Sequence, residues 1–154
     1  MKKTFSFGKV DFNGVGRKIN LVTVDVELKD TDKGPEFTAS GDVRNKNKTD
    51  IICGGQCLDK LYEIPALRSN DTFKKIYMLW RRNHLNGMHA GTENQENYIQ
   101  EKFGDNYPGY TEACEALKEV NLYEDEGYRY GSSWLYRPIS EEDMKMIKEL
   151  LGVN

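Results

Sequence analysis

Apolar and polar residues alternate along the first fifty residues with the period of two that is typical of a half-buried β-strand. Val22, Val24 and Val26 alternate with polar neighbours, and a second run from Phe37 to Val43 follows the same pattern. The stretch 30–35 between the two runs is rich in turn-forming residues. We therefore expect the two runs to form a β-hairpin with one apolar face.

A strand is also expected on each side of this hairpin. In the first, Phe5 and Phe7 keep one phase of the alternation and Val10 keeps the other, so the phase changes around Gly8. Such a change predicts a β-bulge at the glycine. After a turn, the short apolar run Ile51–Cys53 predicts a fourth strand.

From Gly54 onward the apolar spacing becomes helical. We expect a short helix over 56–63 that Pro65 stops, and a longer one that Ser69 or Asn70 caps. The inward face of the longer helix is predicted to contain Phe73, Ile76, Tyr77 and Trp80, and Gly87 is its expected stop.

Further elements are expected in the C-terminal third. Thr92 to Gln95 has the pattern of a capping box, which opens a helix that ends near Gly104. The other expected elements are a helix over 111–120, a hairpin within 122–136 and a last helix that Ser140 caps.

Strands followed by helices predict an α+β fold. The 154 residues suit a single domain over 1–154, with a β-rich part over 1–56 and a mainly helical part over 57–154. In this arrangement an antiparallel β-meander of residues 4–53 packs against the helical half, and the later hairpin and the final helix complete it.

Charge is distributed unevenly. Residues 1–92 carry 16 basic and 11 acidic residues, a net of +5, whereas residues 93–154 carry 6 and 14, a net of −8. This division indicates partner binding or self-association, although two separately solvated halves would also explain it. No secretory leader and no membrane-spanning apolar run is visible, so a reducing cytoplasm is the expected location.

The stretch from Trp80 to Thr92 concentrates candidate chemistry, since it contains both histidines of the chain. Cys53 with Cys57 and His84 with His89 have the spacing of zinc ligands, but a predicted helix and Pro65 lie between the pairs, so we favour an interpretation without zinc, in which His84 is structural and His89 is functional. Cys57, the histidines and neighbouring asparagines would also suit a small hydrolase or nuclease-like enzyme centred on His84 and His89, although no family-specific surround accompanies them.

Two further features indicate binding. Arg81 and Arg82 follow Trp80 at a helix end and could form a basic stripe for DNA, against which the overall acidity of the chain argues. The turn Glu124–Glu126 is either a solvated loop or a mimic of nucleic-acid phosphates. Aromatic residues around both features are typical anchors of protein interfaces.

Three motifs resemble small uncharacterised proteins of phages and mobile elements of Gram-positive bacteria. They are Thr49–Cys57, His84–Thr92 and Tyr130–Leu135, and the resemblance covers most of the chain. It implies an accessory role in the contest between mobile DNA and its host, a role that anti-CRISPR and antirestriction inhibitors share.

The favoured interpretation is a non-enzymatic protein that binds and inhibits a host defence protein such as a CRISPR effector nuclease. A DNA-binding accessory protein and the His84/His89 enzyme are the alternatives. No catalytic residue, metal ligand or cofactor is predicted, and self-association stays open. The candidate binding residues are Trp80, Arg81, Arg82, Asn86, His89, Glu124, Asp125 and Glu126.

Overall fold

The structure is a computed structural model of the chain. It describes residues 1–12, 17–32, 34–45, 51–53, 58–83, 93–122 and 139–153. Within these ranges four strands precede six helices, so the predicted α+β class is confirmed. The change from strands to helices falls between Cys53 and Leu58.

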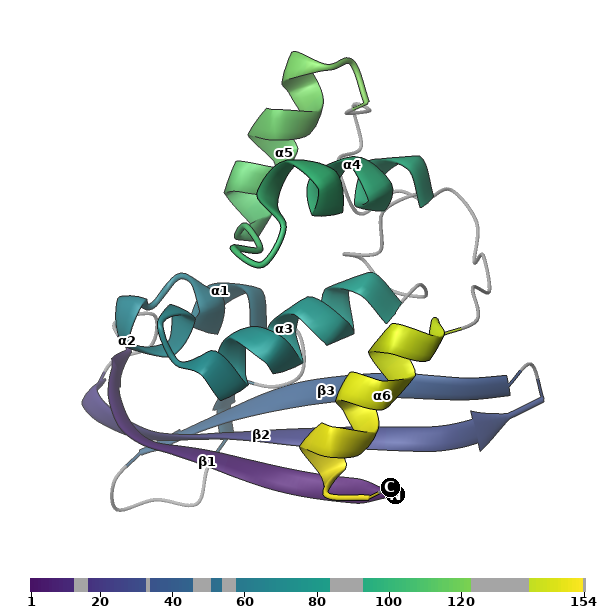
Figure 1. Cartoon of the computed structure of the whole chain (residues 1–154). Helices are drawn as coiled ribbons and strands as arrows, with labels where there is room; N and C mark the ends of the chain where they lie inside the picture. The colour runs from purple at the N-terminus through teal and green to yellow at the C-terminus, as the bar shows by residue number, and fades with distance from the viewer. Residues whose placement is uncertain are drawn as a thin grey trace.

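The strands form one antiparallel sheet in chain order, which is the predicted meander (Figure 1). Its members are β1 (Lys2–Phe12), β2 (Arg17–Thr31), β3 (Gly34–Asn45) and β4 (Ile51–Cys53). Because β2 lies between β1 and β3, its apolar side chains pack against neighbours on both sides.

The predicted inward face of the sheet is confirmed. Val24 lies opposite Gly41 on β3 and opposite Phe5 on β1, so all three share one face. The side of β2 and β3 with this phase is buried at Val22, Val24, Val26, Phe37, Ala39, Gly41 and Val43.

The predicted bulge is also present. Between Ser6 and Lys9 the β1–β2 register shifts by one residue, and Gly8 has a φ of +74°. Glycine adopts this left-handed conformation without the clash that a Cβ would cause. The extra residue explains why the apolar phase of β1 changes at this point.

The β2–β3 connection is shorter than the predicted turn over 30–35. Pairing continues through Asp30 and Pro35 to Thr31 and Gly34, which leaves a two-residue loop. The hydroxyl of Thr31 donates to the carbonyl of Gly34 over 2.7 Å. Two-residue loops match the twist of antiparallel strands, so the hairpin closes tightly. The other residues of the turn-forming stretch 30–35 continue the two strands.

Five of the helices lie in two layers above the sheet, and the C-terminal helix, α6 (Glu141–Leu151), crosses in front of the strands (Figure 1). The first layer rests on the sheet and the second, formed by α4 and α5, lies on the far side of α3. The helices are α1 (Leu58–Tyr62), α2 (Pro65–Arg68), α3 (Asp71–Asn83), α4 (Glu93–Phe103), α5 (Tyr110–Glu119) and α6 (Glu141–Leu151). None of these helices is long and apolar enough to cross a bilayer.

Side-chain hydrogen bonds to nearby backbone groups explain where two of the helices begin. Asn70, one of the two predicted caps of α3, accepts a hydrogen bond from the backbone N–H of Phe73 over 3.0 Å. Ser69, the other candidate, instead donates to the carbonyl of Pro65. Ser140 caps α6 as predicted, since its hydroxyl accepts from the N–H of Asp143 over 3.1 Å.

Pro65 was expected to act only as a stop. It does follow the end of α1, but it also occupies the first turn of α2. Proline suits this position because its missing N–H would find no partner within the helix and its φ is already helical. The predicted hairpin within 122–136 lies outside the described residues beyond Leu122.

Candidate functional site

The last two turns of α3 carry three of the predicted binding residues. As predicted, one side of α3 buries Phe73, Ile76, Tyr77 and Trp80. Arg81 follows Tyr77 by four residues, which places it on the same side, and it is only 3% exposed. Its guanidinium carbon lies 5.9 Å from the centre of the Trp80 ring.

This burial bears on the DNA-binding alternative. Phosphates are bound by cationic side chains that project from the surface. Arg81 does not project in this way, so Arg81 and Arg82 do not form the exposed basic stripe that the sequence suggested. Whether Trp80, Arg81 or Arg82 contacts a partner stays a prediction.

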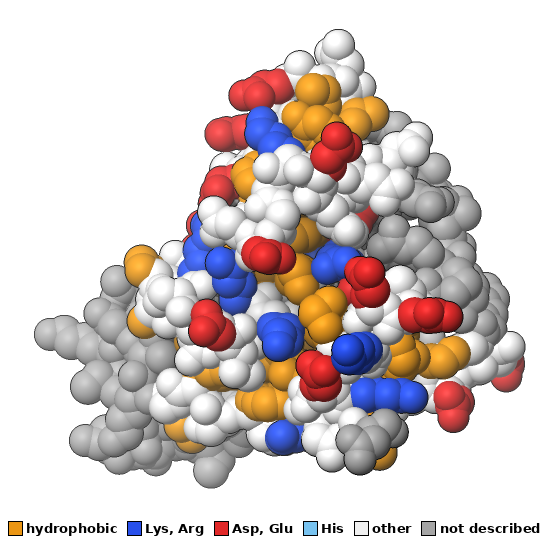
Figure 2. All heavy atoms as spheres, viewed as in Figure 1, with side chains coloured by type: hydrophobic (Ala, Val, Ile, Leu, Met, Phe, Trp, Pro, Cys, Tyr) orange, Lys and Arg blue, Asp and Glu red, His pale blue; other side chains and the backbone are white. Residues whose placement is uncertain are grey.

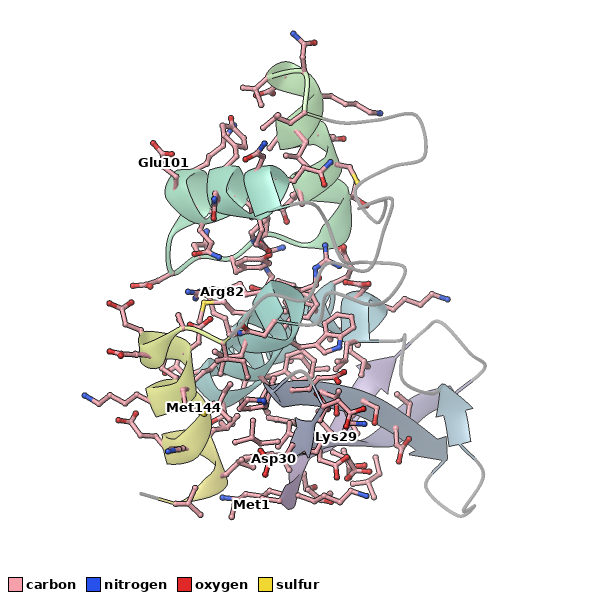
Figure 3. The ribbon with its side chains drawn as sticks, turned by 90° about the vertical axis from the view of Figure 1, so that its right-hand side faces the viewer. Met1, Lys29, Asp30, Arg82, Glu101 and Met144 are labelled. Carbon is pink, nitrogen blue, oxygen red and sulfur yellow. The ribbon has the colours of Figure 1, made fainter. Side chains whose placement is uncertain are left out.

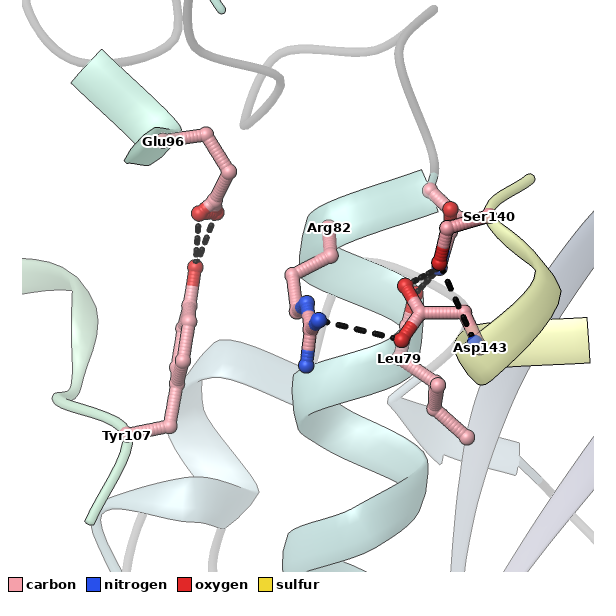
Figure 4. A network of polar contacts seen from close by, with 7 residues as sticks. Leu79, Arg82, Glu96, Tyr107, Ser140 and Asp143 are labelled. Atoms are coloured by element: carbon pink, nitrogen blue, oxygen red, sulfur yellow. Dashed lines mark hydrogen bonds and ion pairs between the residues drawn. The ribbon is translucent and has the colours of Figure 1, made fainter. Parts of the chain in front are cut away.

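Arg82 forms a buried junction with α6 (Figure 4). Its Nη2 lies 3.0 Å from Oδ1 of Asp143, whose side chain is 4% exposed against 17% for Arg82. The other carboxylate oxygen accepts from the side-chain amide of Asn83 over 3.0 Å. The same amide also donates to the carbonyl of Leu79 over 3.1 Å. A single carboxylate therefore joins the end of α3 to the first turn of α6.

A second polar group lies between α3 and the outer helices. The hydroxyl of Tyr107 contacts both carboxylate oxygens of Glu96, at 2.6 Å for Oε2, and Glu96 is 3% exposed (Figure 4). The carbonyl of Tyr107 accepts from the hydroxyl of Tyr62 over 2.5 Å. On the α1 side, Tyr77 donates to Oδ1 of Asp59 over 2.5 Å.

The aromatic rings that carry these hydroxyls pack on one another. Tyr62 and Tyr77 stack with centroids 3.9 Å apart, and Tyr107 meets Tyr77 edge-on at 6.1 Å. Burial raises the pKa of Tyr62, which keeps its hydroxyl a neutral donor, while the charge of Arg68 acts in the opposite direction. Tyrosines thus satisfy buried carboxylates and attach the outer helices to α1 and α3.

Tyr107→Phe is expected to lower the free energy of unfolding by about 1–3 kcal/mol, because a buried carboxylate loses a hydroxyl donor. Urea unfolding followed by circular dichroism measures the change. In a Glu96→Gln background the same substitution should cost less, because no charge then requires the donor. Equal costs in the two backgrounds would show that the hydroxyl does not stabilise Glu96.

A surface ion pair also links the two helical layers. Nη1 of Arg68 lies 2.5 Å from Oε1 of Glu112, and this hydrogen bond lowers the pKa of Glu112 and raises that of Arg68. The stabilisation by Glu112 is present above its unfolded-state pKa and is lost as the pH falls through the lowered folded-state pKa. Both side chains are partly exposed, so solvent screening keeps the contribution small.

The remaining predicted site residues lie outside the described residues. They are His84, Asn86, His89, Cys57, Glu124, Asp125 and Glu126. Cys53 ends β4, but the placement of its side chain is likewise not described. Among the residues that are described, no three histidine, cysteine, aspartate or glutamate side chains lie close enough together to hold a metal ion.

Sequence reasoning did not find Asp143, Glu96 or Tyr107. Asp143 falls in the first turn of the helix that Ser140 is predicted to cap, and Tyr107 falls between two predicted helices, so neither position stands out in the sequence. Comparison with protein-family models, curated proteins and solved structures finds no match for the chain.

Proposed function

We propose that this protein is a phage or mobile-element product that binds a host defence protein and blocks its nucleic-acid-binding surface. A CRISPR effector nuclease is the kind of partner that we favour. The observation that supports the proposal best is the acidity of the outer helical layer. Residues 93–122 contain seven acidic and two basic residues, a net of −5.

The acidic layer is accessible. It stands out from the rest of the molecule (Figure 1), and acidic side chains outnumber basic ones over the upper part of the visible face (Figure 2). Glu101, Asp105 and Glu115 are exposed, and none of them forms an ion pair within the described part of the chain. Their carboxylates are therefore available to a basic partner.

The layer beneath has the opposite charge. Residues 58–83, which form α1 to α3, contain six basic and three acidic residues. Two of the six basic residues, Arg81 and Arg82, are largely buried, so the acidic outer layer rather than a basic surface is the charged feature that can steer a partner into one orientation. The predicted acidic turn Glu124–Glu126 follows the end of α5 by five residues in the sequence and lies outside the described residues.

The paired reversal Glu101→Lys with Glu115→Lys tests this surface. Expression of the wild-type protein should raise phage plating on a host whose CRISPR effector targets that phage, and in vitro it should reduce cleavage of target DNA. The reversed variant should lose both effects while keeping its melting temperature, because both residues are exposed. Reversal of Glu124–Glu126 should act in the same direction.

Asp30→Lys with Asp32→Lys is the matched control. These two residues are exposed in the β2–β3 hairpin and give the same change in net charge. Asp30 lies at the opposite end of the molecule from Glu101 (Figure 3). Equal inhibition by both reversed variants would exclude the α4–α5 surface, and no inhibition by the wild type against a panel of effectors would exclude the proposed partner class.

A further inference from the structure

The outward face of α6 carries a groove of about 440 Å³. Two kinds of side chain line it: the apolar Met144 and Val153, and charged residues of both signs. Among the described residues, the lining consists of Glu141, Met144, Lys145, Lys148, Glu149 and Val153. Glu141, Lys145, Lys148 and Glu149 are exposed, and none of them forms an ion pair with another residue that the structure describes.

The helix beneath the groove is firmly held. Ile147 and Leu151 are buried against the core, and Asp143 is joined to Arg82 and Asn83 of α3. The fold therefore presents this face on a fixed helix, as an interaction surface requires.

The order of charges along the groove is self-complementary. Glu141 precedes Lys148 by seven residues, which is two helical turns and about 10.5 Å along the axis. If a second α6 lies antiparallel across the first, Glu141 of each copy faces Lys148 of the other. Met144 lies between the two ion pairs, close to Lys145 of the partner copy, whose aliphatic stem can cover it.

We propose that the protein forms a two-fold symmetric dimer through antiparallel pairing of α6. A two-fold axis brings the same patch of each copy together, so every favourable contact occurs twice. Antiparallel helices also place the positive end of each helix dipole beside the negative end of the other. This proposal is independent of the acidic surface of α4 and α5, because α6 is a separate element.

Charge reversal in two different variants tests the pairing. Sedimentation equilibrium of the wild type should show a reversible dimer that high salt weakens, since the contacts are ionic. Glu141→Lys and Lys148→Glu should each weaken it on the order of tenfold, because two ion pairs become two like-charge contacts. An equimolar mixture of the two variants should dimerise again, since each substituted side chain of one then faces a side chain of opposite charge on the other.

Glu142→Lys is the matched control. It lies in the same first turn and has the same unfavourable effect on the helix dipole, but it does not line the groove. It should dimerise like the wild type. A wild type that stays monomeric up to millimolar concentration overturns the proposal, as does a mixture of the two variants that associates no better than either alone.

Discussion

Val24→Asp is expected to prevent folding, or to lower the free energy of unfolding by more than about 4 kcal/mol. Val24 is fully buried on the central strand β2, between Phe5 and Gly41. A carboxylate at this position would lose its water, and the apolar residues that line this face of the sheet offer it no compensating charge. Urea unfolding followed by circular dichroism measures the loss.

Ser6→Asp is the control for the added charge. Ser6 lies on β1 opposite Thr23, on the other face of the sheet, and it is exposed. Its substitution should change the free energy of unfolding by no more than about 0.5 kcal/mol. If Val24→Asp and Ser6→Asp unfold at the same urea concentration, the assignment of Val24 to the buried face is refuted.

The sheet could be predicted because the sequence patterns that define its strands involve residues close together in the chain. Alternation along β2 and β3 directly encodes which side faces the helices, and the change of phase at Gly8 encodes the bulge. Caps are equally local: Asn70 and Ser140 act on N–H groups three residues ahead. In each case the interacting groups lie a few residues apart or repeat with a fixed period.

The candidate site depends on groups that are distant in the sequence. Asn83 and Asp143 are 60 residues apart, and Tyr62 and Tyr107 are 45 apart. No spacing rule links such positions, because their meeting depends on how the helices pack. The location of Arg81 shows the same limit: its helical phase allowed burial, but its charge suggested exposure.

The same distinction between local signals and distant contacts applies to the predicted partner surface. Acidity of the C-terminal part was visible from composition, and the structure adds that α4 and α5 carry it as an outer layer. For Arg82 the structure adds a contact that the sequence did not predict, the ion pair of its guanidinium with Asp143 of the same chain, and its contact with a partner stays a prediction.

Asp143→Ala is expected to lower the free energy of unfolding by about 3–5 kcal/mol, the cost of removing one partner from a buried ion pair. The substitution withdraws the carboxylate that faces Arg82 and the acceptor of the Asn83 amide. Asp143 is 3% exposed, so water cannot readily replace the lost groups. The effect on stability should therefore far exceed that of Glu142→Ala, the exposed neighbour in the same helical turn.

A double-mutant cycle separates the ion pair from the loss of packing. Arg82→Met keeps most of the aliphatic stem and removes the charge, so Asp143→Ala should cost clearly less in that background than in the wild type. The difference between the two costs is the coupling energy of the pair. Costs that agree within about 0.5 kcal/mol would mean that the two residues do not stabilise each other, and that α6 is held by its other contacts, among them the buried Ile147 and Leu151.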